Sequence, residues 1–280
     1  MPELPEIETI VRGLRDHILA ATIVRAELLR RDLWKNSDGN PVRFADFFQG
    51  KSFRSIERHG KFIIFELNTG DKLLAHLGMT GKYVIKDQSE PLPEYLCSQF
   101  FFADRIRLDH VDIRRFGRLE LYARDEEIHV LKRIGPDPLA AGFGRQMLQT
   151  LIYAREGSGK RRRAIHPLLL DQTLISGIGN IYAAEALFRA GIRPQRRADR
   201  ITSKELERLA DALRQVLLDA LKAGGTTVND YRRVDDKPGK FRSQLQVYSR
   251  EGEPCRCCRT DIRRVRIQGR SAFFCPSCQR

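Results

Sequence analysis

The tail of the chain carries two cysteine pairs, Cys255-Arg-Cys-Cys258 and, after 16 intervening residues, Cys275-Pro-Ser-Cys278. The spacing C-x2-C-x16-C-x2-C is typical of a four-thiolate zinc site on a β-hairpin, because each pair can present two sulfurs to one ion. Two disulfides or free thiols would have the same spacing. Since the chain shows no secretory signal, we expect one structural Zn²⁺ bound by Cys255, Cys258, Cys275 and Cys278. Four thiolates leave no open position for a reactive water.

The segment between the cysteine pairs is strongly basic. It carries five arginines and a single acidic residue: Arg259, Arg263, Arg264, Arg266, Arg270 and Asp261. A solvated loop could have this composition, but a rigid, metal-bound hairpin of arginines is well suited to a phosphate backbone. We therefore expect this segment to bind nucleic acid. Cys97 and Cys257 have no assigned role, although Cys257 could compete with Cys258 as a ligand.

The composition of the whole chain points to a polyanionic partner. Its 280 residues include 50 Lys and Arg against 36 Asp and Glu, a formal net charge of +14. Such an excess favours nucleic acid or an anionic membrane surface as the partner. A hydrophobic content of 41% excludes a disordered chain. No apolar run is long enough to span a membrane and the N-terminus lacks an apolar signal region, so we expect a cytoplasmic, nucleoid-associated protein.

Hydrophobic periodicity divides the chain into a β-rich part and a helical part. Residues 6–19 have helical spacing, and residues 61–67, 72–77 and 118–122 are predicted strands. The Gly- and Pro-containing stretch Gly135-Pro-Asp-Pro-Leu139 marks a boundary, and beyond it helices are predicted over 168–190 and 203–223. The Gly-rich segment 224–243 is too long for a tight turn, so we expect it to be mobile or functional.

The first residues, MPELPEIET, have two interpretations. Proline in the first turn and acidic residues near a helix N-terminus are common, so the segment could simply start a helix. Alternatively, removal of Met1 would leave Pro2 with a free secondary amine. Its pKa would be near that of an α-amino group, about 7.7–8.0, so a useful fraction would be unprotonated at neutral pH.

Taken together and in this order, the motifs resemble those of the bacterial formamidopyrimidine-DNA glycosylases, relatives of endonuclease VIII, over essentially the whole chain. Besides MPELPEIET and the cysteine tail, the matching stretches in the first half are Gly60-Lys61-Phe62, His76-Leu-Gly-Met-Thr-Gly81, Arg114-Arg-Phe-Gly117 and Gly135-Pro-Asp-Pro-Leu139. Those in the second half are Ser176-Gly-Ile-Gly-Asn-Ile-Tyr182, Gly224-Gly-Thr-Thr227, Lys237-Pro-Gly239 and a strand at Gln244-Leu-Gln-Val-Tyr248.

The resemblance implies a catalytic set of Pro2, Glu3 and Lys61. Pro2 would attack C1′ of the damaged nucleotide and form an iminium with the opened sugar. Glu3 would assist ring opening and move protons, although an acid here could also only stabilise the helix start. Lys61 would reach a phosphate beside the lesion. Glu6 could support the helix start or take part in catalysis.

The resemblance also implies residues that bind DNA. These residues are His76, Met79, Arg114, Phe116, Asn180 and Arg270. Met79, Arg114 and Phe116 would fill the space left by an everted nucleotide, and Arg114 would face the opposite base, for which the family prefers cytosine. Asn180 and Arg270 would hold the backbone. Without the family resemblance, Met79 and Phe116 would be interpreted as core residues.

Two further residues of the same motif have open roles, and two stretches depart from the family. Tyr182 could contact a phosphate or pack internally, and Glu185 could line the lesion pocket or pair with an arginine. Ile113 replaces a proline that usually precedes R-R-F-G, and residues 88–107 diverge. These departures leave the lesion range and opposite-base preference open. Leu4 favours the formamidopyrimidine branch over endonuclease VIII, which often has glycine there.

The resemblance implies an α+β multidomain protein. We expect an N-terminal β-sandwich catalytic domain with a leading helix over 1–133 and a linker over 134–150. A helical helix–two-turns–helix domain with a lesion-capping loop should follow over 151–243, and a β-hairpin zinc finger over 244–280. Double-stranded DNA would lie in the cleft between the two globular parts, and we expect a monomer.

The implied activity is that of a bifunctional DNA glycosylase and lyase of base excision repair. It would remove 8-oxoguanine and formamidopyrimidines and cleave the abasic strand by β,δ-elimination. Two alternatives are an endonuclease VIII-like enzyme for oxidised pyrimidines and a zinc-dependent protein that binds damaged DNA without catalysis. The joint presence of Pro2, Glu3 and Lys61 disfavours the second.

Overall fold

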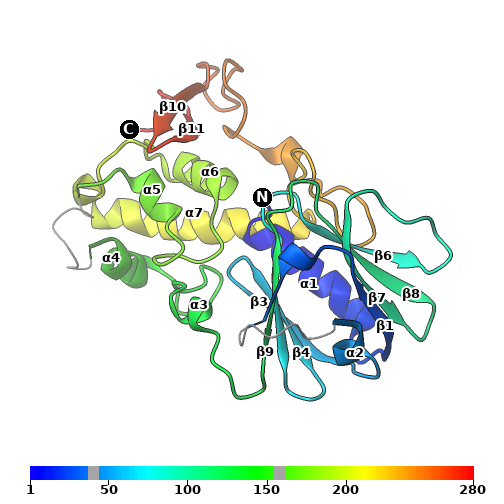
Figure 1. Ribbon diagram of the computed structural model, residues 1–280. Helices are drawn as coiled ribbons and strands as arrows, with labels where there is room; N and C mark the ends of the chain where they lie inside the picture. The colour runs from blue at the N-terminus through cyan, green and yellow to red at the C-terminus, as the bar shows by residue number, and fades with distance from the viewer. Residues whose placement is uncertain (37–43, 154–161) are drawn as a thin grey trace. The chain divides into compact units, whose positions relative to one another are not determined.

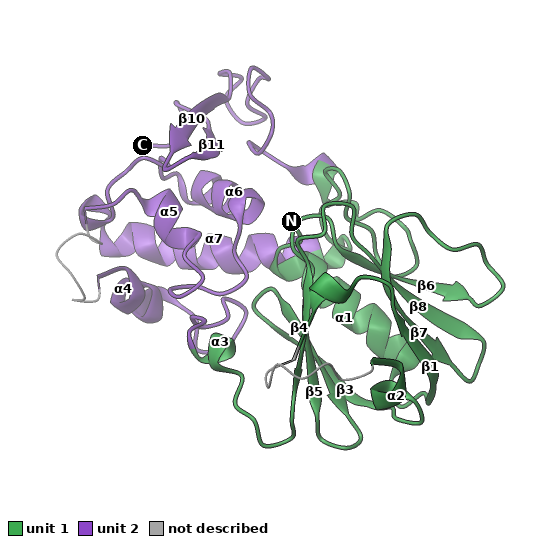
Figure 2. Ribbon diagram, viewed as in Figure 1, with its two compact units in different colours: residues 1–132, 221–242 green, residues 133–220, 243–280 purple. Residues whose placement is uncertain are grey.

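The computed structural model describes residues 1–36, 44–153 and 162–280 (Figure 1). They form two compact units, 1–132 with 221–242, and 133–220 with 243–280 (Figure 2). The predicted helical domain included the segment 224–243, whereas the structure groups nearly all of it with the N-terminal unit. None of the helices in the described ranges is both long and apolar enough to cross a membrane.

The N-terminal unit contains two sheets and a leading helix. One sheet has the order β1-β7-β8-β6, and its strands are β1 (Ile23–Leu28), β6 (Lys82–Asp87), β7 (Leu96–Phe102) and β8 (Ile106–Val111). The other has the order β2-β9-β5-β4-β3, with β2 (Trp34–Asn36), β3 (Phe53–His59), β4 (Phe62–Leu67), β5 (Lys72–His76) and β9 (Arg118–Tyr122). Among the described residues of these two sheets, β2 and β9 form the only parallel pair of strands, and all other pairs are antiparallel. The helical elements are α1 (Leu4–Ile18), η1 (Arg31–Leu33), α2 (Phe44–Phe48) and α3 (His129–Lys132). The predicted leading helix and the three predicted strands are confirmed.

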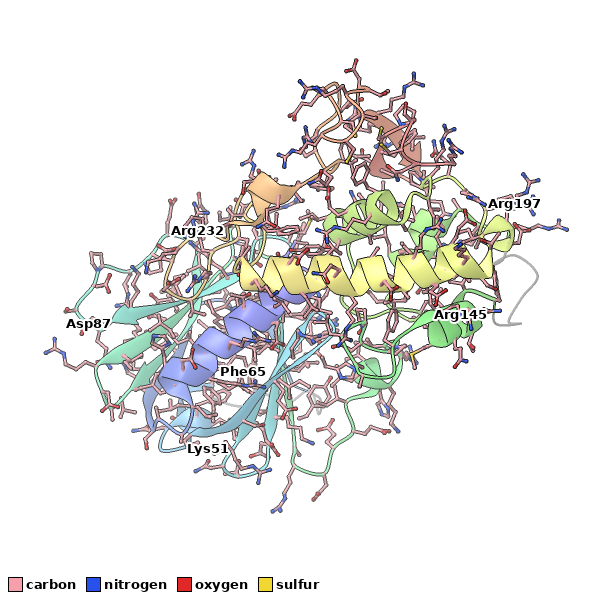
Figure 3. All side chains as sticks on the ribbon, turned by 180° about the vertical axis from the view of Figure 1, so that it is seen from behind. Lys51, Phe65, Asp87, Arg145, Arg197 and Arg232 are labelled. Atoms are coloured by element: carbon pink, nitrogen blue, oxygen red, sulfur yellow. The ribbon has the colours of Figure 1, made fainter. Side chains whose placement is uncertain are left out.

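The core of this unit lies between the two sheets and under α1. The apolar stripe of α1 is buried in the same cluster as side chains of both sheets. Phe53 of β3 meets Phe100 of β7, and Phe65 of β4 meets Tyr83 of β6, each pair with ring centroids 5.7 Å apart. Phe65 lies within this core, whereas Lys51 and Asp87 lie at the edge of the unit (Figure 3). The predicted β-sandwich is therefore confirmed.

His110 of β8 is buried in this core beside Tyr83, and its ring nitrogens have no hydrogen-bond partner among the described residues. Burial lowers the pKa of His110 to about 4, against a smaller upward effect of Asp112. The unfolded chain, with a His pKa near 6.5, therefore takes up the proton first as the pH falls. Stability contributed by the neutral ring is present above about pH 6.5 and is lost as the pH falls through about 4.

We expect His110→Phe to reduce the pH dependence of unfolding between about pH 6.5 and 4, by an order of 3 kcal/mol at the lower limit. Urea unfolding at several pH values in this window measures the effect. Exposed Leu92, which does not titrate, provides the control, since Leu92→Ala should leave the pH dependence unchanged. Equal pH dependence in the wild type and His110→Phe would contradict the prediction.

The C-terminal unit is helical and ends in a β-hairpin. It contains α4 (Arg145–Tyr153), α5 (Ile165–Leu169), α6 (Asn180–Ala190), η2 (Ala198–Arg200) and most of α7 (Ser203–Lys222). The hairpin is β10 (Arg263–Ile267) with β11 (Arg270–Phe274). The short helix η3 (Phe241–Gln244) crosses the boundary of the two units. The predicted helix 203–223 is confirmed, and α4 begins inside the segment predicted as a linker.

Two predictions for this unit are wrong. The predicted helix 168–190 is two helices, because the chain turns between them and Gly177 takes a positive φ of 77°. The predicted strand 244–248 does not form. Instead the buried carboxylate of Glu185 accepts the backbone N–H groups of Gln246, Val247 and Tyr248, each at 2.9 Å. The Glu185 carboxylate thus substitutes for a strand partner of this segment.

Candidate functional site

The start of α1 holds Pro2 and Glu3 in a fixed backbone. Glu3 is the N-cap residue and Pro5 lies in the first turn, where its missing N–H has no helical partner to lose. Glu3 and Glu6 form a reciprocal capping box, in which the Glu3 N–H donates to Glu6 Oε2 at 2.9 Å. Pro2, Glu3 and Glu6 are all buried.

The second carboxylate oxygen of Glu6 holds the segment 224–242. The Thr226 N–H donates to Glu6 Oε1 at 2.7 Å. Gly225 has a φ of 87°, and a Cβ there would lie 2.8 Å from the Tyr231 ring and 3.1 Å from Glu6 Oε1. Glycine is therefore required at this close approach. The structure gives Glu6 a supporting contact on each side, to the helix start and to this segment.

Segment 224–242, which is nearly all of the predicted lesion-capping loop 224–243, has several fixed points within the N-terminal unit. Tyr231 is buried and donates its hydroxyl to the Gly224 carbonyl at 3.1 Å. Val234 packs against Gly13 of α1 and accepts the N–H of Ile85 at 2.8 Å through its carbonyl. These contacts fix the segment at Gly224, Tyr231 and Val234, whereas Asn229 and Asp230 are exposed.

Lys61 and the chain terminus meet at the start of α1. Lys61 precedes β4 in the turn after Gly60 and is 7% exposed. Burial lowers the pKa of the Met1 amine, Glu3 and Glu6 raise it, and Lys61 lowers it further. These charges are therefore close enough to act on one amine. With Met1 attached, the nitrogen of Pro2 is an amide, and the amine of the structure belongs to Met1.

His76 ends β5, opposite Phe62 of β4, and presents a neutral ring. The Gly78 N–H donates to His76 Nδ1 at 3.2 Å, so the ring proton is on Nε2. Burial, followed by the charges of Arg118 and Lys61, lowers the pKa of His76 to about 4. At neutral pH His76 is therefore an uncharged ring with one N–H donor, and the charge of Lys61 acts on it.

Met79, Arg114 and Phe116 come together on two neighbouring loops. Met79 is 41% exposed and Phe116 is 57% exposed, which excludes the alternative that they are core residues. The Arg114 guanidinium lies over the Phe116 ring, 4.8 Å from its centroid. Gly78 allows close approach, since a Cβ there would be 2.6 Å from the Phe116 carbonyl carbon.

Buried Asp112 joins these two loops. One oxygen accepts the Thr80 hydroxyl at 2.6 Å and the Arg114 N–H at 3.2 Å, and the other accepts the Gly117 N–H at 2.8 Å. The Thr80 hydroxyl in turn accepts the Arg114 N–H at 2.9 Å. Asp112 thus fixes the backbone on both sides of the exposed loop, in place of the φ restraint that proline would give at Ile113.

We expect Asp112→Ala to lower the free energy of unfolding by about 2–4 kcal/mol, because it leaves buried donors on both loops without an acceptor. Asp112→Asn should have a smaller effect, since one oxygen remains. Urea unfolding measures both variants. Asp104, an exposed residue of the β7–β8 turn, gives the control Asp104→Ala. A stability of Asp112→Ala equal to that of the control would contradict the role of Asp112.

Asn180 and Arg270 come together in the C-terminal unit. Asn180 is the first residue of α6, after the N-cap Gly179. Its Nδ2 donates to the Ser271 carbonyl at 2.8 Å, next to the exposed Arg270 at the start of β11. Tyr182, by contrast, is fully buried.

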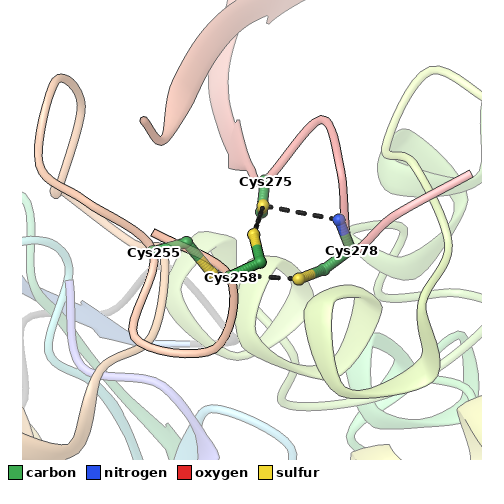
Figure 4. Close-up of side chains that lie close together, drawn as sticks. All are labelled: Cys255, Cys258, Cys275 and Cys278. Carbon is green, nitrogen blue, oxygen red and sulfur yellow. Dashed lines mark hydrogen bonds between the residues drawn. The ribbon is translucent and has the colours of Figure 1, made fainter. Parts of the chain in front are cut away.

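The four predicted ligand cysteines are gathered at one end of the hairpin (Figure 4). The sulfurs of Cys255, Cys258, Cys275 and Cys278 all lie within 4.8 Å of one another. Cys258 and Cys275 are separated by 3.4 Å, and Cys255 and Cys278 by 3.9 Å. A tetrahedral ion with bonds of about 2.3 Å needs sulfurs about 3.8 Å apart, so the cluster fits a structural metal. Exposed Cys257 is outside the cluster.

The structure thus brings the predicted residues together in four groups. Two belong to the N-terminal unit: Pro2 and Glu3 with Lys61 and His76, and Met79 with Arg114 and Phe116. Two belong to the C-terminal unit: Asn180 with Arg270, and the four cysteines. The sequence analysis gave no role to Thr80 or Asp112, and it gave Glu185 other roles than the one observed. All three are buried polar side chains. A buried polar residue resembles a surface residue in the sequence, so only a hydrogen-bond partner distant in the chain reveals it.

Three family models match the chain in succession. They are the formamidopyrimidine-DNA glycosylase N-terminal domain over residues 1–119, the formamidopyrimidine-DNA glycosylase H2TH domain over 134–232, and the zinc finger found in FPG and IleRS over 252–280. The models follow the order of the predicted parts.

Curated relatives and solved structures match over the full length. A formamidopyrimidine-DNA glycosylase of Desulfitobacterium hafniense is 43% identical over 283 residues, which cover all of both chains. A Lactococcus lactis FPG mutant in complex with a Fapy-dG containing DNA is 32% identical with a TM-score of 0.89, and all of both chains are covered. The wild-type Lactococcus lactis FPG in complex with an oxidized pyrimidine containing DNA is 32% identical with a TM-score of 0.88, again over both whole chains.

Proposed function

The chain belongs to the formamidopyrimidine-DNA glycosylase family, whose members are DNA repair glycosylases and AP lyases, and from this premise we propose its substrates and mechanism. It removes 8-oxoguanine and formamidopyrimidines from double-stranded DNA and cleaves the abasic strand by β,δ-elimination. The observation that carries the proposal is the start of α1, where Pro2 and Glu3 are buried and the charges of Glu3 and Lys61 both act on the amine of the adjoining Met1.

Pro2 is the nucleophile once Met1 has been removed. The lone pair of its secondary amine attacks C1′, and the damaged base leaves with the electrons of the glycosidic bond and a proton. Opening of the sugar ring, assisted by the Glu3 carboxyl, gives a cationic iminium. The iminium acidifies C2′–H, so loss of that proton expels the 3′ phosphate. A second elimination expels the 5′ phosphate, and water then releases Pro2.

Residues of both units hold the DNA. Lys61 and the N–H of neutral His76 contact phosphates near the reacting sugar. Met79, Arg114 and Phe116 enter the space left by the everted nucleotide, and their exposure supports this role. Asn180 and Arg270 hold the flanking backbone. A single structural Zn²⁺ bound by the four cysteines would maintain the hairpin that carries Arg270, and the protein acts as a monomer.

Affinity for duplex DNA should fall steeply as salt rises, because phosphate contacts release counterions. We expect Arg270→Ala to reduce the slope of log affinity against log salt by about 1. Fluorescence anisotropy with an abasic-site duplex over a salt series measures the slope. Arg145 on α4, far from the hairpin within the same unit, offers the control Arg145→Ala (Figures 1 and 3). An unchanged slope in Arg270→Ala would contradict its phosphate contact.

The lesion class has one supported alternative. The complex of the Lactococcus lactis relative with an oxidized pyrimidine containing DNA favours pyrimidine lesions as additional or alternative substrates. The other alternative, a zinc-dependent protein without catalysis, would bind damaged DNA but would not cleave it.

Borohydride trapping tests the proposal with three duplexes, carrying 8-oxoguanine opposite cytosine, an oxidised pyrimidine, or an abasic site. The protein is untagged and its loss of Met1 is verified by mass. We expect an adduct on the 8-oxoguanine duplex that maps to Pro2. Adducts only on the oxidised pyrimidine and abasic duplexes would move the substrate to the alternative class. Binding without an adduct on any duplex would contradict the enzymatic proposal.

A further inference from the structure

Three buried polar atoms of the C-terminal unit have no hydrogen-bond partner among its described residues. They are the two ring nitrogens of His166 and the side-chain oxygen Oδ1 of Asn180. His166 is 0% exposed. An unpaired buried polar atom costs about 1–3 kcal/mol, so such atoms are rare and often have a functional reason.

The three atoms belong to neighbouring side chains. His166 lies on α5, Asn180 begins α6, and Arg270 begins β11; α6 contacts both α5 and β11. The Asn180 carboxamide and the Arg270 charge both act on the His166 ring. His166 is therefore buried next to the two residues that we assign to the DNA backbone.

His166 is uncharged at neutral pH. Burial, together with the positive charge of Arg270, lowers its pKa to about 4, while the Asn180 carboxamide acts in the opposite direction. A neutral imidazole has one N–H donor and one acceptor nitrogen. The unused donor of His166 and the unused acceptor Oδ1 of Asn180 are thus chemically complementary.

The orientation of the Asn180 carboxamide decides whether it can bind a phosphate. Nδ2 has two hydrogens, of which one is donated to the Ser271 carbonyl at 2.8 Å. The second can be donated to a phosphate oxygen only if Oδ1 is directed away from that phosphate. A rotation of the carboxamide by half a turn would place the carbonyl against the phosphate and the Ser271 carbonyl, and both contacts would be repulsive.

We propose that His166 is a positioning residue of this phosphate site: in the DNA-bound state its neutral ring donates a hydrogen bond to Asn180 Oδ1 and holds Nδ2 toward the phosphate. The inference rests on the proposed function, because it takes Asn180 as a phosphate ligand. His166 itself touches neither the DNA nor the reacting sugar.

A double-mutant cycle tests the coupling. The dissociation constant of an abasic-site duplex is measured at fixed salt for His166→Leu, Asn180→Ala and the double variant. We expect each single change to weaken binding about tenfold and the double variant to be within about twofold of Asn180→Ala. His166→Gln, which keeps a donor, should remain within about threefold of the wild type. Arg264 is an exposed residue of β10 and serves as a control. In the double variant of Arg264→Ala and His166→Leu, the fold-change in dissociation constant should equal the product of the two single changes.

The outcomes separate this inference from the proposed function. If Asn180→Ala weakens binding but its effect multiplies with that of His166→Leu, the positioning role is wrong and the phosphate contact stands. If Asn180→Ala binds like the wild type, the phosphate contact itself is wrong. Equal losses in His166→Gln and His166→Leu, in step with their melting temperatures, would show that His166 only packs.

A second measurement covers the case in which His166→Leu does not fold. Long-range ¹H–¹⁵N spectra of the wild-type protein with the duplex should show one His166 ring N–H that exchanges slowly with solvent. A ring N–H that exchanges as fast as that of exposed His129 would overturn the hydrogen bond.

Discussion

A short N-terminal extension left on Pro2 should lower lyase activity by at least about 1,000-fold, because it converts the nucleophilic amine into an amide with no available lone pair. Binding of an abasic-site duplex should change by less than about threefold if the extension is flexible, since the phosphate contacts come from other residues. The extension ends in a specific protease site, so that cleavage of the same preparation leaves Pro2 as the first residue. Strand cleavage and borohydride trapping are measured before and after proteolysis.

The same design provides its own control, because the two samples share every residue from Pro2 onward. Recovery of both activity and the trapped adduct after cleavage would support the role of Pro2. Glu3→Gln in the cleaved form should still bind DNA but lose base release by about 100-fold or more, as expected for loss of a general acid or base. Equal lyase activity before and after proteolysis would show that another amine, such as that of Lys61, is the nucleophile.

The features that the sequence predicted well are local ones. The four ligand cysteines stand in two short pairs, and the strands β4, β5 and β9 are short apolar runs bounded by turns. In each case the residues that determine the feature lie close together in the sequence. The exposed Met79 and Phe116 required the family resemblance, because a large apolar residue gives no sign in the sequence of whether it is buried.

The features that the sequence missed depend on pairs of residues distant in the chain. Glu185 accepts N–H groups that are 61–63 residues away, and these groups would otherwise need a strand partner. The alternating apolar residues of 244–248 therefore resemble a strand although the backbone is satisfied by a side chain. Glu6 likewise holds Thr226 across 220 residues. No spacing rule links such positions.

The metal site should contribute the largest single effect on the C-terminal unit. We expect Cys275→Ser to remove the ion, unfold the hairpin and weaken DNA binding by at least about 100-fold, since folding of small zinc domains depends on about 10–16 kcal/mol of metal binding. Cys255 and Cys275 are buried in a cluster with Ile262, Val247 and Phe188, the last of which lies on α6. An ion bound by these cysteines would therefore support α6, which begins at Asn180, as well as the hairpin, whose second strand β11 begins at Arg270.

The matched control is Cys257→Ser, which changes an exposed thiol outside the cluster. Elemental analysis should give one zinc per chain for the wild type and Cys257→Ser, and none for Cys275→Ser. Far-ultraviolet spectra and duplex binding are measured on the same samples. If Cys257→Ser lost the metal and Cys275→Ser kept it, the ligand set would be wrong. If Cys275→Ser lost the metal but bound DNA normally, the hairpin would contribute no phosphate contact, and the affinity would have to come from the N-terminal unit and α6 alone.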